Sequence, residues 1–174
     1  GAEVIGDMEL FARAINALPE AERPSVVGIT GTNGKSTTTA LVGHILKKAG
    51  RDVHVGGNIG DAVLGLPAPR PGAVYVLELS SYQLDLTHSL TCDVAILLNL
   101  SPDHLDRHGD MDGYLKAKKR IFANQTASHT AIIGVDDDYT RGVCTALMSA
   151  GPMKVVPVSS GRALSRGVYA LGGK

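Results

Sequence analysis

The stretch SVVGITGTNGKS, residues 25–36, decides the fold of this 174-residue chain. Its first six residues are mostly apolar and β-branched and predict a buried strand, and the residues from Ser36 to Lys48 predict a helix. The glycine-rich turn between them can point successive backbone N–H groups at an anion, and the start of the helix adds a partial positive charge there. This order of strand, turn and helix predicts a phosphate-binding loop.

Two side chains of the loop carry the chemistry that phosphates need. Lys35 supplies a full positive charge for the outer phosphates, and Ser36 supplies a hydroxyl for Mg²⁺. The strict phosphate-loop pattern requires a glycine at position 29, which is isoleucine here, and Gly28 misses that place by one residue. The alternative is an ordinary glycine turn that caps a helix, but the GKS triplet at a strand-to-helix junction favours phosphate binding.

The rest of the chain alternates short apolar runs with amphipathic patterns. Strands are predicted at 53–55, 73–79, 93–98, 130–135 and 154–158, helices at 8–18 (after Asp7 as N-cap), 112–123 and 137–150, and weak edge strands in 161–174. Strands that alternate with helices indicate an α/β fold with a mostly parallel sheet flanked by helices, of the P-loop NTPase-like kind.

Composition excludes several classes of protein. Seventeen basic residues balance seventeen acidic ones, so the net charge of zero argues against nucleic acid or an anionic membrane as the general partner. No apolar run approaches the ~20 residues of a membrane span, and the N-terminal residues do not resemble a signal peptide. Two cysteines cannot form a disulfide framework and fit a reducing compartment. We expect a single cytoplasmic domain.

Glu78 interrupts an otherwise apolar predicted strand. A carboxylate at the carboxyl end of a parallel strand lies at the sheet edge where ligands bind, and there it could hold Mg²⁺. The alternative is a buried carboxylate satisfied by hydrogen bonds, which is rare for glutamate unless it is paired. Together with the phosphate loop, the position of Glu78 favours a metal-binding role.

The segment SPDHLDRH, residues 101–108, crowds two histidines, two aspartates and an arginine after another predicted strand. His104 and His108 are four residues apart, which suits a zinc pair on a helix, but no glutamate or cysteine completes a zinc motif nearby. A solvated loop with Asp106 or Asp110 as a helix cap is one interpretation. The other is a second cation or substrate site that uses His104.

The lysine-rich segment 114–122 predicts a helix with one basic residue turned inward. Tyr114, Lys118 and Ile121 share a helix face, whereas Lys116 and Lys119 diverge from it. An inward lysine is costly unless it is paired or chemically altered, and spacing alone does not decide between the two.

These motifs together resemble the Mur ligase family, the ATP-dependent amino-acid ligases of peptidoglycan synthesis. The resemblance rests on GITGTNGKSTTT, GGNIG, LELSSYQLD, LLNLSPDHLDRH and YLKAKKRIF, which spread from about residue 26 to 124. Within the family, LELSSYQL is most similar to the member that adds D-glutamate to UDP-N-acetylmuramoyl-L-alanine.

The resemblance implies a role for each matching residue. The loop Gly31, Thr32, Asn33, Gly34, Lys35, Ser36 and Thr37 would cradle ATP, with Lys35 also steadying the transferred phosphoryl group. Ser36 and Glu78 would hold one Mg²⁺, and His104 a second together with Lys118, which the family carries as a carbamate. Asn58 and Ser80 match positions that contact the muramoyl-alanine substrate.

The implied reaction transfers the γ-phosphoryl group of ATP to the substrate carboxylate, after which the D-glutamate amine forms the amide. The family has three domains, and we expect residues 1–174 to be the central one, with 1–24 as a linker and first helix, acting as a monomer on small molecules. The N-terminal uridine-binding and C-terminal domains would be absent, and the chain stops at 172–174 near a family segment that contacts adenine. The alternatives are a folylpolyglutamate synthase-like ligase and a non-catalytic phosphate-loop module.

Overall fold

A parallel sheet of seven strands forms the centre of the molecule. The computed structural model describes residues 2–171 and orders the strands β2-β3-β1-β4-β5-β6-β7, with every neighbouring pair parallel. The strands are β1 (Ser25–Thr30), β2 (Asp52–Gly57), β3 (Ala73–Glu78), β4 (Val94–Leu97), β5 (Thr130–Gly134), β6 (Lys154–Ser159) and β7 (Val168–Tyr169). The sequence-based expectation of an α/β fold with a parallel sheet is confirmed.

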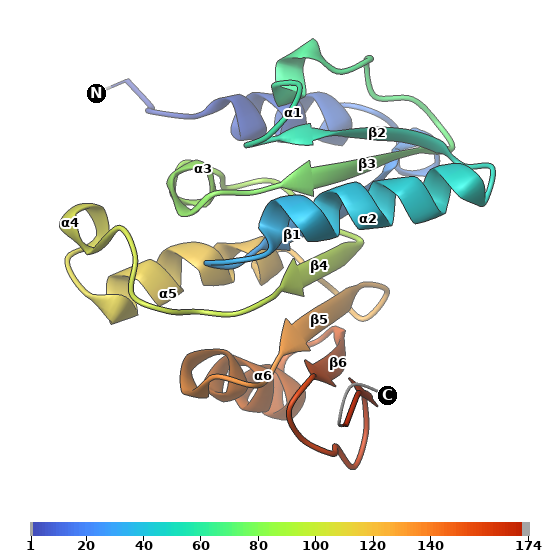
Figure 1. The fold of residues 1–174 in the computed structure, drawn as a ribbon. Helices are drawn as coiled ribbons and strands as arrows, with labels where there is room; N and C mark the ends of the chain where they lie inside the picture. Colours follow the sequence, from blue (N-terminus) through green and yellow to red (C-terminus); the bar gives the residue numbers. More distant parts are fainter. Residues whose placement is uncertain (1, 172–174) are drawn as a thin grey trace.

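Helices cover the two faces of this sheet unequally. They are α1 (Asp7–Asn16), α2 (Lys35–Lys48), α3 (Ser81–Asp85), α4 (Leu105–His108), α5 (Met111–Lys119) and α6 (Asp138–Ala150), with short 3₁₀ turns η1 (Glu20–Glu22), η2 (Val63–Gly65) and η3 (Arg120–Phe122). Helix α2 lies in front of the sheet in Figure 1, against β2, β3 and β1, while α3 and α4 lie on the side to which the strand arrowheads point. The carboxyl ends of the strands therefore face α3, α4 and the start of α2.

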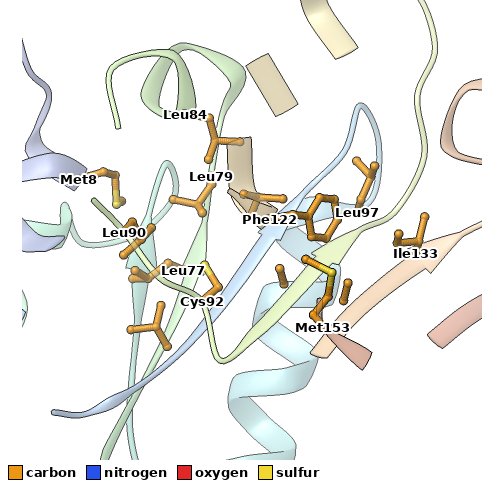
Figure 2. Packing of buried hydrophobic residues seen from close by; sticks show 14 of the residues in the cluster. Met8, Leu77, Leu79, Leu84, Leu90, Cys92, Leu97, Phe122, Ile133 and Met153 are labelled. Carbon is orange, nitrogen blue, oxygen red and sulfur yellow. The ribbon is translucent and has the colours of Figure 1, made fainter. Parts of the chain in front are cut away.

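Two hydrophobic clusters hold these layers together. The larger one joins α1, α5, η3 and α6 to the face of the sheet that carries Leu77, Leu97 and Ile133 (Figure 2). The smaller one joins Val42 and Leu46 of α2 to the opposite face. Cys92 and Cys144 are free and buried in the larger cluster.

The structure corrects several element boundaries. Gly6, not Asp7, is the N-cap of α1, because Gly6 has an extended backbone and its carbonyl accepts the first helical hydrogen bond, from the Leu10 N–H at 3.3 Å. The helix expected at 112–123 ends at Lys119 and continues as the turn η3. In the tail, β7 is the one short strand among the described residues, and 172–174 lie outside them.

Gly28 has a packing role in β1. A Cβ atom at Gly28 would lie 2.6 Å from the Cys92 sulfur, so β1 needs a glycine there for close contact with Cys92.

No helix within residues 2–171 combines the length and apolarity that a membrane crossing requires.

Candidate functional site

The phosphate loop connects β1 to α2 at the carboxyl edge of the sheet. Gly34 caps α2 with a left-handed backbone, φ 82°, which favours glycine. The first backbone N–H that finds an acceptor inside the helix is that of Thr38, which donates to Gly34. The N–H groups of Lys35, Ser36 and Thr37 therefore have no intrahelical partner and can serve an anion. The Lys35 ammonium folds back onto the Thr32 carbonyl at 2.9 Å.

Glu78 ends β3 beside this loop and is buried, with 1% of its surface exposed. One carboxylate oxygen accepts a hydrogen bond from the Ser36 hydroxyl at 2.8 Å, and the other accepts one from the Asn58 amide at 2.9 Å. Gly57 permits this approach, because a Cβ atom there would lie 2.4 Å from the Glu78 carbonyl oxygen. The loop GGNIG thus positions Asn58 on the carboxylate.

Lys118 reaches inward from α5 to the end of β1. It is 2% exposed, and its ammonium donates to the Gly31 carbonyl at 2.9 Å and to the Thr30 hydroxyl at 3.3 Å. Its nitrogen also lies 4.8 Å from the centre of the Tyr114 ring. Burial, reinforced by the positive charge of Lys35, lowers the pKa of Lys118 to about 7. The prediction of an inward lysine is confirmed.

His104 lies at the start of α4, with a left-handed backbone, φ 51°, and about half of its side chain exposed. Its ring contacts Tyr82 edge-on at 5.2 Å between centroids, and its Nε2 lies 3.4 Å from an Asp103 carboxylate oxygen. Left-handed backbone is uncommon outside glycine, although histidine is among the residues that tolerate it. His104 thus lies beside Tyr82 of α3 and 6.4 Å from the Tyr114 ring of α5, measured between ring centroids.

His108 and Asp110 have structural partners in the same segment. The His108 Nε2 atom lies 3.0 Å from the Ser81 hydroxyl, and burial lowers the pKa of His108. Asp110 caps α5 by accepting a hydrogen bond from the Gly113 N–H at 2.8 Å, as one sequence interpretation expected, whereas Asp106 lies inside α4. The zinc pair finds no support, since residues 2–171 contain no cluster of three His, Cys, Asp or Glu side chains able to hold a metal.

A cavity of about 460 Å³ is lined by five of the residues that the sequence singled out. Ser80, at its wall, caps α3 in a reciprocal capping box with Gln83. We call this space the acceptor cavity; its lining comprises Lys35, Asn58, Ser80, Ser81, Tyr82, Gln83, His104, Tyr114 and Lys118. It brings together five of the predicted site residues (Lys35, Asn58, Ser80, His104 and Lys118) from five separate segments, next to the Ser36–Glu78 pair.

A second cavity, of about 610 Å³, lies on the other side of the phosphate loop and was not predicted. We call it the base cavity; it is lined by Asn33, Gly34, Thr38, Ile96, Leu98, Asn99, Ile132, Gly134, Asp136, Asp137, Val158 and Ser160. Hydrogen bonds from the Ser159 hydroxyl and the Ser160 N–H lower the pKa of Asp136, which keeps a carboxylate at its rim. An apolar wall with a few polar groups is typical of a small-molecule site.

A third cavity, of about 440 Å³, lies at the opposite edge of the sheet, beside the start of β1. Its lining includes Arg23, Asp93 and His129 and none of the predicted site residues. The Arg23 guanidinium donates hydrogen bonds to the carbonyls of Asn16 and Leu18, at and just after the end of α1. It therefore ties that helix end to the segment before β1. The chemistry therefore concentrates at the carboxyl edge of the sheet.

The donor set around Glu78 fits a hard divalent cation. Ser36 and Glu78 offer oxygen atoms that already lie 2.8 Å apart. Two protein ligands are few, but Mg²⁺ usually takes one or two from the protein and the rest from water and phosphate. An ammonium offers no lone pair, so Lys118 in its ordinary form is a donor and not a cation ligand.

The sequence is similar to known proteins over the region that holds these site residues. Residues 29–162 match the Mur ligase middle domain. The chain belongs to the Mur ligase family. It is 62% identical over 173 residues to a UDP-N-acetylmuramoylalanine–D-glutamate ligase of Caulobacter sp. strain K31 and 63% to that of Phenylobacterium zucineum. Each match covers 99% of this chain and 37% of the relative, so the chain spans little more than a third of their length.

Solved structures share the fold at lower identity. A UDP-N-acetylmuramoyl-L-alanyl-D-glutamate–2,6-diaminopimelate ligase aligns with a TM-score of 0.71 at 24% identity, over 94% of this chain and 38% of that one. Escherichia coli FolC aligns with a TM-score of 0.64 at 18% identity, over 94% of this chain and 50% of that one. These likenesses establish the architecture of the Mur ligase middle domain for this chain.

Proposed function

We propose that residues 1–174 are the central ATP-binding domain of a ligase that adds D-glutamate to UDP-N-acetylmuramoyl-L-alanine in peptidoglycan precursor synthesis. The observation that carries the proposal is the pair of cavities on the two sides of one phosphate loop. Such an arrangement suits a nucleotide on one side and a phosphoryl acceptor on the other. The curated relatives with 62–63% identity bear the name of this ligase.

The nucleotide would extend from the base cavity, which would hold its base, to the phosphate loop, which would hold its phosphates. The apolar wall of Ile96, Ile132 and Val158 suits a base, and the Asp136 carboxylate suits ribose hydroxyls. The phosphates would then meet the N–H groups at the start of α2 and the Lys35 ammonium. Two proteins with this fold, E. coli FolC and Thermotoga maritima MurF, are known in complex with ADP.

Ser36 and Glu78 would hold one Mg²⁺ at the phosphates. Such a cation neutralises the charge of a triphosphate and polarises its phosphoryl oxygens. Before a cation binds, the Ser36–Glu78 hydrogen bond keeps the two ligand oxygen atoms close together. Asn58 donates a hydrogen bond to the second oxygen of the buried carboxylate. This pre-formed pair keeps a buried charge from being left without partners.

Lys118 would become a ligand by carbamylation. A pKa of about 7 leaves a large fraction of its amine neutral near neutral pH, and only the neutral amine attacks carbon dioxide. The ammonium first loses one proton, and formation of the N–C bond from the neutral amine and carbon dioxide then releases a second. The cation is thereby converted into a carbamate anion with oxygen ligands. His104, which lines the same cavity, would complete a second Mg²⁺ site with it.

The acceptor carboxylate would enter the acceptor cavity, where Asn58 and Ser80 offer polar contacts. It attacks the γ-phosphorus of ATP, the bond to the bridging oxygen breaks and ADP leaves. The amine of D-glutamate then attacks the resulting acyl phosphate, loses a proton and expels inorganic phosphate, leaving an amide. Lys35 steadies the transferred group, and positioning supplies much of the rate.

Enzyme assays on the full-length ligase that contains this chain test the proposal. In the full-length ligase, ADP release should require both UDP-N-acetylmuramoyl-L-alanine and D-glutamate. The 174-residue chain alone should bind ATP but show no ligase activity, because binding surfaces from the other domains are needed to position the reactants. We further propose that the ligase acts in the cytoplasm, where its soluble small-molecule substrates would be found, and that it acts as a monomer. ADP release with a pteroate and L-glutamate instead would support the folylpolyglutamate synthase-like alternative and overturn the proposal.

A further inference from the structure

Asn99, the second residue after β4, holds the phosphate loop through three hydrogen bonds. Its side-chain oxygen accepts from the Asn33 N–H at 2.9 Å, and its side-chain nitrogen donates to the Asn33 carbonyl at 3.0 Å. Its own carbonyl accepts from the Thr32 N–H at 3.0 Å. An amide that both donates to and accepts from one residue copies the pairing of a β-ladder. We call the two side-chain bonds between Asn99 and Asn33 the Asn99 clamp.

The clamp decides which N–H groups of the loop remain for a ligand. The Thr32 and Asn33 N–H groups already have acceptors, both supplied by Asn99. Those of Lys35, Ser36 and Thr37 lack an intrahelical partner, as the start of every α-helix does. An anion on this loop is therefore served by the N–H groups of residues 34–37 and not by those of Thr32 and Asn33.

A second contact ties the same two segments together. The Thr32 hydroxyl donates to the Ser101 carbonyl at 3.2 Å and accepts from the Ser101 N–H at 3.1 Å. The Tyr114 hydroxyl lies 3.3 Å from the same Thr32 oxygen. The residues just after β4 thus fix Thr32 and Asn33 together, while the loop itself is rich in glycine and flexible in principle.

We propose that Asn99 is a positioning residue that fixes the phosphate loop for triphosphate binding. The inference rests on the proposed nucleotide function and adds a residue to it. Ordering a glycine-rich loop costs conformational entropy, and a loop that is already fixed does not incur that cost when phosphate binds. Asn99 also lines the base cavity, so a direct contact with the base is the competing role.

The variant Asn99→Ala tests the clamp, with Asn124→Ala as its matched control. Asn124 also bridges segments with its side chain, donating to the His88 carbonyl at 2.9 Å and the Leu90 carbonyl at 3.0 Å, but at the opposite edge of the sheet. Both variants should retain the circular dichroism spectrum of the wild type. Calorimetry would measure the dissociation constants of ATP, ADP and adenosine for the 174-residue chain, and NMR would measure amide exchange without ligand.

For Asn99→Ala we expect the dissociation constants of ATP and ADP to rise about tenfold, with that of adenosine unchanged. The Asn33 amide should exchange at least about tenfold faster, whereas that of Thr32, which keeps the Asn99 carbonyl, should change less. Asn124→Ala should alter neither measurement.

Unchanged ATP affinity, or unchanged exchange at Asn33, would overturn the positioning role. An equal loss of adenosine affinity would overturn it in favour of a base contact. A wild-type chain that binds no triphosphate, with exchange at Asn33 still dependent on Asn99, would overturn the nucleotide function while leaving the clamp in place.

Discussion

The Lys118 ammonium donates a hydrogen bond to the carbonyl of Gly31 at 2.9 Å, which ties α5 to the first residue of the phosphate loop. The two residues are 87 positions apart in the chain and meet where β1 ends. Lys118 also faces the acceptor cavity. A change in the charge of Lys118 would therefore alter both its hydrogen bond to the phosphate loop and the electrostatics of the acceptor cavity.

Lys35→Ala should weaken the binding of ATP far more than that of adenosine. A charge-assisted contact is worth about 1.5–3 kcal/mol, and adenosine has no phosphate to make it. Titration calorimetry on the 174-residue chain measures both affinities, with Lys47→Ala in the exposed last turn of α2 as the matched control. Equal ATP affinity for Lys35→Ala and wild type would refute the phosphate-loop assignment.

Lys118→Ala should leave the full-length ligase nearly inactive, with partial rescue by acetate or formate. The substitution removes the proposed carbamate ligand and leaves space beside His104 into which a small carboxylate can diffuse. The control is Lys116→Ala, an exposed neighbour on the same helix, which should stay close to wild type. Near-normal activity of Lys118→Ala without added acid would contradict the assigned role, as would the absence of a carbamate mass on Lys118 under native conditions.

The pKa of Lys118 also predicts how stability changes with pH in carbon dioxide-free buffer. An unfolded lysine keeps its proton to about pH 10, whereas the folded one releases it near pH 7. Between these values the unfolded chain binds more protons, so the free energy of unfolding rises with pH. From pH 7 to 9 the wild type should gain about 2 kcal/mol relative to Lys118→Met, measured by urea unfolding. A difference that stays constant over this range would show that the buried amine keeps an ordinary pKa.

Glu9 predicts a rise of stability with pH in a separate window, on the acid side. Burial opposes ionisation of this carboxylate, but hydrogen bonds from His88, Ser89 and Arg13 outweigh it and lower the pKa of Glu9 to about 2. Its stabilisation is therefore complete above about pH 4.5 and is lost as the pH falls through 2.

Glu9→Gln should cost about 2 kcal/mol at pH 7, and the gap to wild type should close as the pH approaches 2. Glu3→Gln is the control, because Glu3 binds the same Arg13 in an exposed pair worth little. Urea unfolding at pH 2, 3, 4 and 7 measures both differences. A gap that persists unchanged at pH 2 would contradict the lowered pKa.

Local sequence pattern predicted the features that depend on neighbours in the chain. The parallel strands and the inward face of Lys118 follow from apolar periodicity. Helix α3 carried a readable signal that was missed, since Ser80 and Gln83 form a capping box three residues apart. The base cavity carried no local sequence signal, because its lining residues Asn33, Ile132 and Val158 come from three distant segments. Asn99 was missed for the same reason, as its partner Asn33 lies 66 residues away.

A crystal structure of the 174-residue chain with Mg²⁺ and a non-hydrolysable ATP analogue would show directly whether the nucleotide occupies the base cavity and the phosphate loop. We expect the phosphates on the N–H groups of Lys35, Ser36 and Thr37, the base against Ile132, and the Asn99 clamp intact. A triphosphate bound away from this loop, or a base lodged in the acceptor cavity, would contradict the two-cavity arrangement on which the proposed function depends.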